Sequence, residues 1–275
     1  MTSPIGGRAL RHVTALSSGG PLAPRSPVTL NFHPQPPVLR ALADTGRYHS
    51  QFVTGTSNGG LTAHPGGDRW NWESRIFGGA YDHAPADERP VYGALNFRRR
   101  IAGAAPRFGS AHFRLNDEVL ARTTFCYPDS HFEPTHFGVA SRMALIDLAE
   151  ADDRDVLDDY IEAHVHGPVR LDRDVEALVL DPSHRGTDVE AAARSLPCPI
   201  EWHPGFRVTI DCLRHHEDYR GKEYVDLAAE IAVDGWLNPH ILGMAAGHDA
   251  QALKKVWHYL ARFGSPRRCK TMCRS

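Results

Sequence analysis

One segment of the chain places a phenol, an acid and two imidazoles at alternating positions. Residues 160–166 read Tyr-Ile-Glu-Ala-His-Val-His, and this period of two predicts a β-strand with Tyr160, Glu162, His164 and His166 on one face. A carboxylate in such company can act as a general base or stabilise a developing positive charge. The alternative interpretation is the solvated outer face of an antiparallel sheet that happens to be rich in histidine.

A second candidate is His33, which ends a segment where Val28, Leu30 and Phe32 alternate with polar residues. This pattern predicts a strand with His33 at its end, on the polar face. A single histidine in such a place is more often a hydrogen-bonded structural residue than a catalytic one. A functional role for His33 therefore requires that the fold bring it close to Glu162.

The two histidines of the strand also allow a metal site. His164 and His166 share a face, and His33, Asp181 or Glu162 could complete a ligand set of the kind found in metal hydrolases. An HxH pair is a weak signal, because the chain has 17 histidines among 275 residues and chance pairs are expected. A metal-dependent hydrolase that uses a histidine cluster is the alternative enzyme.

Residues 47–114 are rich in glycine and aromatic side chains, which is typical of short strands and long ordered loops. Ser57 lies in a glycine-rich turn that either approaches a phosphate or ribose with its backbone amides or simply closes a hairpin. Tyr92 belongs to an aromatic group that either fills the core or stacks on a flat ring. Neither a P-loop nor a strand-GxGxxG-helix pattern is present, so a dinucleotide-binding Rossmann unit is not predicted.

Composition limits the classes of function. The net charge of -2 and the pI of about 6.8 provide no global positive field that would attract nucleic acid or anionic membrane. The five cysteines are scattered without a CxxC pair, which argues against a disulfide framework and a structural zinc knuckle. The chain has neither a signal-peptide pattern nor a run of roughly 18 apolar residues. We therefore expect a cytoplasmic protein without a membrane partner.

Four segments are predicted along the chain. Residues 1–26 are rich in Gly, Ser and Pro and are expected to form a flexible N-terminal segment. Residues 27–185 form the α+β candidate catalytic domain, residues 186–265 a helical C-terminal region, and residues 266–275 a basic tail. Apolar spacing in the C-terminal region predicts helices over residues 189–196, 208–216, 223–233, 239–246 and 250–263.

Five motifs together resemble the uncharacterised bacterial family DUF3626. They are PVTLNFHP at 27–34, GRYHSQF at 46–52, GTSNGG at 55–60, RPVYGALN at 89–96 and EAHVHG at 162–167. The resemblance extends roughly from Pro27 to Gly264, and it implies no function.

A weaker likeness does imply a function. The order of an early polar strand, a serine-bearing turn, Arg-Pro-x-Tyr-Gly at 89–93, a strand that ends Arg-Thr-Thr-Phe with Asp-Ser after it, and a late glutamate strand is similar to ADP-ribosyltransferase toxin-like domains. Those domains bind NAD in a bent form and use no metal. The likeness implies an α+β fold with an N-terminal split β-sandwich and a helical C-terminal region. It also implies Glu162 as the catalytic residue and His33, Ser57 and Tyr92 as residues that bind NAD.

The chemistry that the likeness implies is coherent. Cleavage of the nicotinamide–ribose bond builds positive charge on the sugar, which a fixed carboxylate stabilises. We therefore expect ADP-ribosyl transfer or NAD glycohydrolase activity, with NAD as co-substrate and protein, nucleic acid or water as acceptor. Arginine-directed members carry Glu or Gln where this chain has Tyr160, and His33 replaces an early strand arginine, so the acceptor stays open. A non-catalytic interaction protein is the second alternative.

Overall fold

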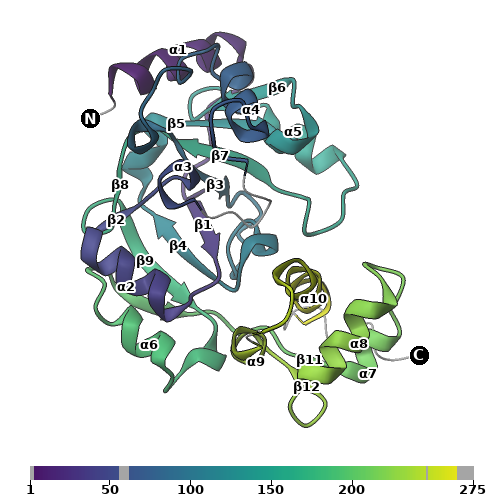
Figure 1. Cartoon of the computed structure of the whole chain (residues 1–275). Helices are drawn as coiled ribbons and strands as arrows, with labels where there is room; N and C mark the ends of the chain where they lie inside the picture. The colour runs from purple at the N-terminus through teal and green to yellow at the C-terminus, as the bar shows by residue number, and fades with distance from the viewer. Residues whose placement is uncertain (1–2, 56–61, 246, 265–275) are drawn as a thin grey trace.

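The computed structural model describes residues 3–55, 62–245 and 247–264. Its centre is one eight-stranded sheet, made of β1 (Val28–Phe32), β3 (Val91–Leu95), β4 (Ala111–Leu115), β5 (Thr123–Tyr127), β6 (His136–Val139), β7 (Ile161–Val165), β9 (Val175–Leu180) and β10 (Ile200–Trp202). The strand order is β10-β9-β4-β1-β3-β7-β5-β6 (Figure 1). All neighbours pair antiparallel except β9 and β10, which are parallel.

Helices and short ribbons surround this sheet. The helices are α1 (Pro4–Leu16), α2 (Pro36–Thr45), α3 (Gln51–Thr54), α4 (Asp68–Ile76), α5 (Leu145–Ala151), α6 (Asp188–Ala193), α7 (Ile210–Arg214), α8 (Lys222–Ile231), α9 (Pro239–Met244) and α10 (Ala250–Phe263). The single-turn and two-turn 3-10 helices are η1 (Ala86–Glu88), η2 (Pro106–Phe108), η3 (Asp117–Arg122), η4 (Ser130–Phe132) and η5 (Pro182–His184). Two ribbons pair β2 (Arg47–Tyr48) with β8 (Val169–Arg170) and β11 (Val208–Thr209) with β12 (Trp236–Leu237). The predicted α+β class is confirmed.

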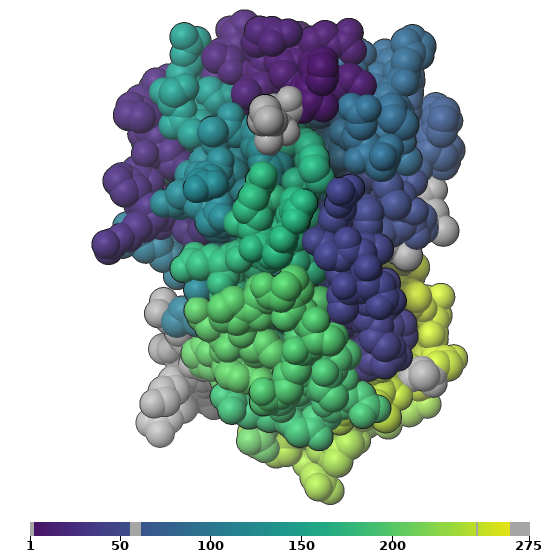
Figure 2. Space-filling model, turned by 90° about the vertical axis from the view of Figure 1, so that its left-hand side faces the viewer, coloured from purple at the N-terminus to yellow at the C-terminus, as the bar shows by residue number. Residues whose placement is uncertain are grey.

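One face of the sheet is apolar and forms the main core. Strand alternation sends Leu30, Phe113, Ile161 and Leu178 to this face, where they pack with residues of α2, α5 and α6 in one cluster. Helices α2 and α6 pack side by side there, as the dark blue and green segments in Figure 2 show. Burial of this face explains why the apolar period of the sequence locates the strands.

The opposite face carries the polar side chains, and it is also covered. Cross-strand pairing places Cys126 and Ala94 on either side of Glu162, and Thr124 and Tyr92 on either side of His164. Glu162 is only 7% exposed and His164 and His166 are fully buried. The solvated-face interpretation is therefore wrong, because α4, the loop 96–109 and the C-terminal helices lie over this side of the sheet.

The C-terminal helices have a core of their own and dock onto the sheet through Trp257. Helices α7 to α10 and the β11–β12 ribbon form a second apolar cluster, seen as the green and yellow group at the lower right of Figure 1. The Trp257 indole N–H donates to the carbonyl of Pro106 at 2.9 Å, and its ring meets His33 edge-on. The prediction for 250–263 matches α10. The predicted helix 208–216 begins only at Ile210, because the Thr209 hydroxyl caps it by accepting from Cys212 N–H.

The N-terminal segment differs from the sequence expectation. Residues 4–16 form α1, where Ser3 accepts from Gly6 N–H and Pro4 occupies the first helical turn. Ala9 and Val13 on one side of this helix are fully buried in a third apolar cluster. The segment is rich in glycine and serine, so its composition predicted flexibility although Ala9 and Val13 are spaced as on one face of a helix.

No helix among the described residues has the length and apolar character needed to cross a membrane.

Gly93 lies in the middle of β3, between β1 and β7. A Cβ there would lie 2.6 Å from the Leu30 Cδ2 atom and 2.8 Å from the carbonyl oxygen of Thr29. We expect Gly93→Ala to lower the free energy of unfolding by about 1–3 kcal/mol, because the strand pair must move apart. Urea denaturation measures this loss. Gly243→Ala is the control, since no described atom outside its chain neighbours and its own helix backbone lies within 4 Å of a Cβ built there. An equal loss in both variants would refute the explanation.

Candidate active site

Glu162 lies in β7 with its carboxylate surrounded by hydrogen-bond donors. The Nε2 atom of His164 lies 2.9 Å from Glu162 Oε1. Ser130, in the turn that follows β5, donates its backbone N–H to Oε1 at 3.3 Å and its hydroxyl to Oε2 at 3.2 Å. The Cys126 thiol of β5 donates to Oε1 at 3.7 Å. We call Glu162, His164, Ser130 and Cys126 the Glu162 site.

These neighbours keep the carboxylate charged. Burial acts to raise the pKa of Glu162, but the hydrogen bonds of His164 and Ser130 and the charge of Arg69 outweigh it and hold the pKa below its usual value. A charged carboxylate with most of its solvent removed exerts a strong field on a cation placed beside it. This is the property that stabilisation of an oxocarbenium-like sugar requires.

Behind Glu162, the two histidines of the strand are fully bonded to side chains. Thr124 Oγ1 lies 3.2 Å from His164 Nδ1 and 3.0 Å from His166 Nε2. The remaining nitrogen of His166, Nδ1, lies 2.7 Å from the Tyr81 hydroxyl. Burial, with the charge of Arg122, lowers the pKa of His166 to about 3, so this ring is neutral near pH 7. Both ring nitrogens of His166 are therefore engaged, and it has no free lone pair for a metal.

Tyr92 lies beside the Glu162 site, as its position in β3 opposite His164 requires. Its ring meets the His164 ring edge-on at 4.9 Å, and its hydroxyl donates to Glu73 Oε1 at 3.3 Å. The guanidinium of Arg69 lies over the Tyr92 ring, 4.3 Å from its centroid. The Nε and Nη1 atoms of Arg69 are buried without a hydrogen-bond partner in the described part of the chain. Glu162, Tyr92 and Arg69 thus form one group.

A buried ion pair supports this group from the side of α4. Arg89 Nη1 lies 2.6 Å from Glu73 Oε2, with both side chains almost completely buried. Burial raises the pKa of Glu73 to about 7 against the lowering effects of Arg89, Arg69 and the Tyr92 hydroxyl. Arg89 also donates from Nη2 to the Tyr81 carbonyl at 2.8 Å, so this guanidinium is held on both sides.

Tyr160 and Asp129 form a hydrogen-bonded pair next to Glu162. The Tyr160 hydroxyl donates to Asp129 Oδ2. Burial and the charge of Glu162 raise the pKa of Asp129, although the hydrogen bond from Tyr160 opposes this. Two neighbouring carboxylates whose pKa values move in opposite directions are suited to opposite proton-transfer roles.

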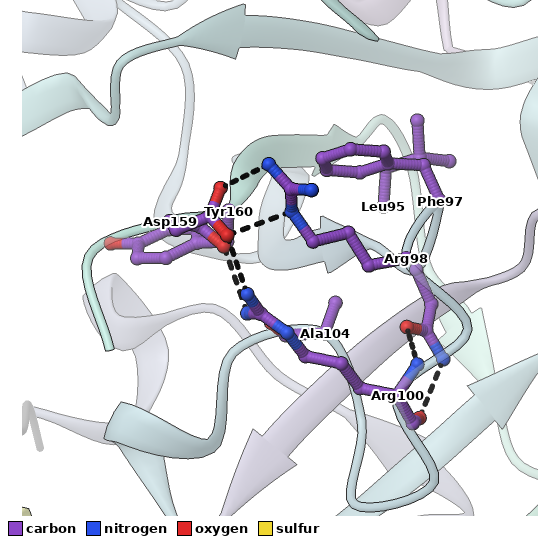
Figure 3. Close-up of a pocket in the computed structure, with 8 residues that line it drawn as sticks. Leu95, Phe97, Arg98, Arg100, Ala104, Asp159 and Tyr160 are labelled. Atoms are coloured by element: carbon purple, nitrogen blue, oxygen red, sulfur yellow. Dashed lines mark hydrogen bonds and ion pairs between the residues drawn. The ribbon is translucent and has the colours of Figure 1, made fainter. Parts of the chain in front are cut away.

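A small depression lies next to Tyr160, just before the start of β7, and ion pairs of Asp159 fill it. Asp159 lies 2.7 Å from Arg98 Nε and 2.6 Å from Arg100 Nη2, and Figure 3 shows both guanidinium groups directed at this carboxylate. The depression is lined also by Leu95, Phe97 and Ala104. These contacts fasten the loop 96–104 to the start of β7, which fixes the strand that carries Glu162.

One thiol, one carboxylate and one imidazole of the Glu162 site lie close enough together to form a possible metal site. The donor atoms of Cys126, Glu162 and His164 lie within 4.8 Å of one another, as in no other such group of the described residues. Burial raises the pKa of the Cys126 thiol well above its usual value, assisted by the charge of Glu162. In this structure the thiol donates a hydrogen bond to the Glu162 carboxylate.

His33 occupies a different part of the polar face. Thr29 of β1 pairs with Ala94, which pairs with Glu162, and His33 lies four residues beyond Thr29. At about 3.3 Å per residue, His33 is displaced roughly 13 Å along the sheet and two strands across it. It contacts Trp257 edge-on at 4.9 Å, and burial together with His184 lowers its pKa to about 4.

The structure brings together Glu162 and Tyr92 of the predicted site residues, and it separates His33 from them. Ser57 lies outside the described residues. Sequence reasoning did not assign a role to Thr124, Ser130 or Arg69. Thr124 lies in the predicted strand Arg-Thr-Thr-Phe, and Ser130 belongs to the Asp-Ser pair that follows it. Pairing of that strand with the glutamate strand would have placed both residues near Glu162. Arg69 gave none, because its approach to Tyr92 depends on the packing of α4.

Comparison with known proteins gives a family without a described activity. No curated protein matches the chain. The family model for a protein of unknown function, DUF3626, matches two overlapping segments, residues 27–149 and 136–262. These segments include β1, β7 and α10, and so contain the sheet, the Glu162 site and the docked helices. The chain therefore belongs to the DUF3626 family.

Proposed function

We propose that this protein cleaves the nicotinamide–ribose bond of NAD, as an ADP-ribosyltransferase or an NAD glycohydrolase, with Glu162 as the catalytic residue. The observation that carries the proposal is the charged Glu162 carboxylate, which is nearly buried and held by donors from Ser130, Cys126 and His164. Fixed negative charge in a site of low dielectric stabilises the positive ribose of the transition state. The carboxylate also accepts a hydrogen bond from a ribose hydroxyl or from the incoming acceptor.

Arg69 and Tyr92 support the same assignment. NAD is a dianion at its diphosphate, and Arg69 offers two buried N–H groups that have no partner among the described residues. Tyr92, stacked under that guanidinium, also contacts His164 of the Glu162 site, so its ring is available as an aromatic contact close to both groups. A cation for the diphosphate and a carboxylate for the ribose are thus both close to Tyr92 in this proposal.

The likeness to ADP-ribosyltransferase toxin-like domains supports the proposal through motif order. We propose with it a split β-sandwich and NAD-binding roles for His33 and Ser57. In this proposal His33 would serve the part of NAD farthest from Glu162, because of its displacement along the polar face. Protein, nucleic acid or water remains the proposed acceptor.

The direct test incubates the purified chain with NAD and measures free nicotinamide by chromatography. We expect nicotinamide to accumulate with time and enzyme concentration. Free ADP-ribose in equal amount would identify a glycohydrolase, and ADP-ribose attached to an added protein or nucleic acid would identify a transferase. Absence of both nicotinamide release and thermal stabilisation by NAD would refute the proposal.

Elemental analysis of untagged protein tests the competing metal-dependent hydrolase. We expect no stoichiometric metal in a preparation that releases nicotinamide, because the proposed ADP-ribosyltransferase-like chemistry uses none. Stoichiometric zinc that disappears in a Cys126→Ser variant would instead favour the hydrolase. His33→Ala serves as the control, since His33 lies away from these three groups.

A further inference from the structure

Four consecutive hydrogen bonds join the Tyr81 hydroxyl to Glu162 through the interior. They connect Tyr81 to His166 Nδ1 (2.7 Å), His166 Nε2 to Thr124 (3.0 Å), Thr124 to His164 Nδ1 (3.2 Å) and His164 Nε2 to Glu162 Oε1 (2.9 Å). We call this chain the histidine relay. Tyr81, Thr124, His164 and His166 are all completely buried. Phe77 meets both histidine rings edge-on and closes the relay on one side.

The Glu162 end determines where the first proton lies. Glu162 Oε1 already accepts from the Ser130 backbone N–H and the Cys126 thiol, and Oε2 accepts from the Ser130 hydroxyl. A carboxylate that receives donors on both oxygens is ionised and acts only as an acceptor. His164 must therefore carry a proton on Nε2 and donate it to Oε1.

The other protons follow in order along the relay. A neutral His164 presents a lone pair at Nδ1, so the Thr124 hydroxyl donates to it. This hydroxyl has a single proton, so its contact with His166 must be an N–H from Nε2. His166 then accepts at Nδ1 from the Tyr81 hydroxyl.

The opposite direction leaves a proton without an acceptor. If His164 carried protons on both nitrogens, Thr124 would donate to His166, and His166 would donate to the Tyr81 oxygen. The Tyr81 hydroxyl has no second hydrogen-bond partner in the described part of the chain, and its proton would be buried unsatisfied. Such a group costs about 1–3 kcal/mol, which favours the direction toward Glu162.

We propose that the histidine relay donates in one direction, from Tyr81 to Glu162, and that Thr124 and His166 are positioning residues for the Glu162 carboxylate. The catalytic consequence rests on the proposed function. Oε1 is occupied by donors from three residues, whereas among the described residues Oε2 accepts only from the Ser130 hydroxyl. Oε2 is therefore the oxygen that engages the ribose hydroxyl or the incoming acceptor.

Nitrogen–proton correlation spectra of ¹⁵N-labelled protein at neutral pH test the direction without any substrate. We expect His164 and His166 to be neutral and protonated at Nε2, with the two rings assigned from His164→Asn and His166→Asn variants. Thr124→Val should shift the Nδ1 resonance of His164, because that nitrogen loses its donor. Thr124→Ser should restore it. Thr123→Val is the matched control, since the Thr123 hydroxyl donates to the carbonyl of Val119 and not to the relay.

The same variants give the catalytic readout. We expect Thr124→Val to lower kcat for nicotinamide release about 10-fold to 100-fold with little change in KM. This is the range for loss of a residue that orients a functional side chain by a hydrogen bond without contacting the substrate. Thr124→Ser should recover most of this loss. A His164 protonated at Nδ1 or at both nitrogens in the unchanged chain would overturn the proposal, even if Thr124→Val does not fold. The expected spectra without any NAD turnover would support the relay and refute the proposed function alone.

Discussion

Replacement of Glu162 by glutamine should lower kcat for nicotinamide release about 10²-fold to 10³-fold, the range for loss of one group that stabilises transition-state charge. The amide keeps the shape of the carboxylate but removes the charge that faces the ribose. KM for NAD should change little, because the expected loss is in the transition state rather than in substrate binding. Steady-state kinetics with chromatographic detection of nicotinamide measures both constants.

Two further measurements make this test specific. Glu118→Gln is the control, since Glu118 is exposed and lies in η3, away from the Glu162 site. Thermal denaturation should show that Glu162→Gln remains folded. In the unchanged chain the pKa of Glu162 is held below its usual value, so the proposed nicotinamide release should persist as pH falls through the ordinary range of carboxyl groups and decline only below it. Turnover by Glu162→Gln close to that of the unchanged chain would show that another group is the catalyst.

Replacement of Arg89 by methionine should destabilise the fold by about 3–5 kcal/mol at pH 8, because it leaves Glu73 buried without its ion-pair partner. The loss should be smaller at pH 5. Burial raises the pKa of Glu73 from its usual 4.5 to about 7, so folding takes up a proton, and the associated stability is present below pH 4.5 and declines as pH rises through 7. Without the guanidinium the pKa of Glu73 rises further, and the decline continues to higher pH. Urea denaturation at both pH values measures the difference.

A double variant and a surface variant separate the causes. Glu73→Gln combined with Arg89→Met should recover part of the loss at pH 8, since no charge then remains buried and unpaired. Arg170→Met removes an ion pair with Asp172 in which both side chains are about half exposed, and it should cost only about 0–1 kcal/mol. A loss in Arg89→Met that is equal at pH 5 and pH 8 would contradict the role assigned to the Glu73 charge.

Local periodicity predicted those features that depend on neighbours in the sequence. The alternation in 160–166 correctly placed Glu162, His164 and His166 on one strand face, and the helical spacing of 250–263 correctly predicted α10. Both patterns arise because one side of each element packs against apolar residues, so the chain itself records them.

Features that depend on distant segments could not be predicted in this way. The burial of His164 requires α4 and the loop 96–109 to cover the polar face, and nothing in residues 160–166 indicates that cover. The separation of His33 from Glu162 follows from the strand order, in which β3 lies between β1 and β7. A sequence motif gives the order of residues along the chain, whereas the strand order and register of the sheet determine which residues lie close together.

The parallel pairing of β10 with β9 has a consequence for where this chain can be divided. The boundary expected at residue 185 passes between these two strands, although Ile200, Glu201 and Trp202 pair directly with Leu178, Val179 and Leu180. A fragment that ends at 185 would expose the backbone N–H and carbonyl groups of β9, which form a template for aggregation. The smallest autonomous unit of this fold therefore reaches past β10, and expression of shorter fragments should yield insoluble protein.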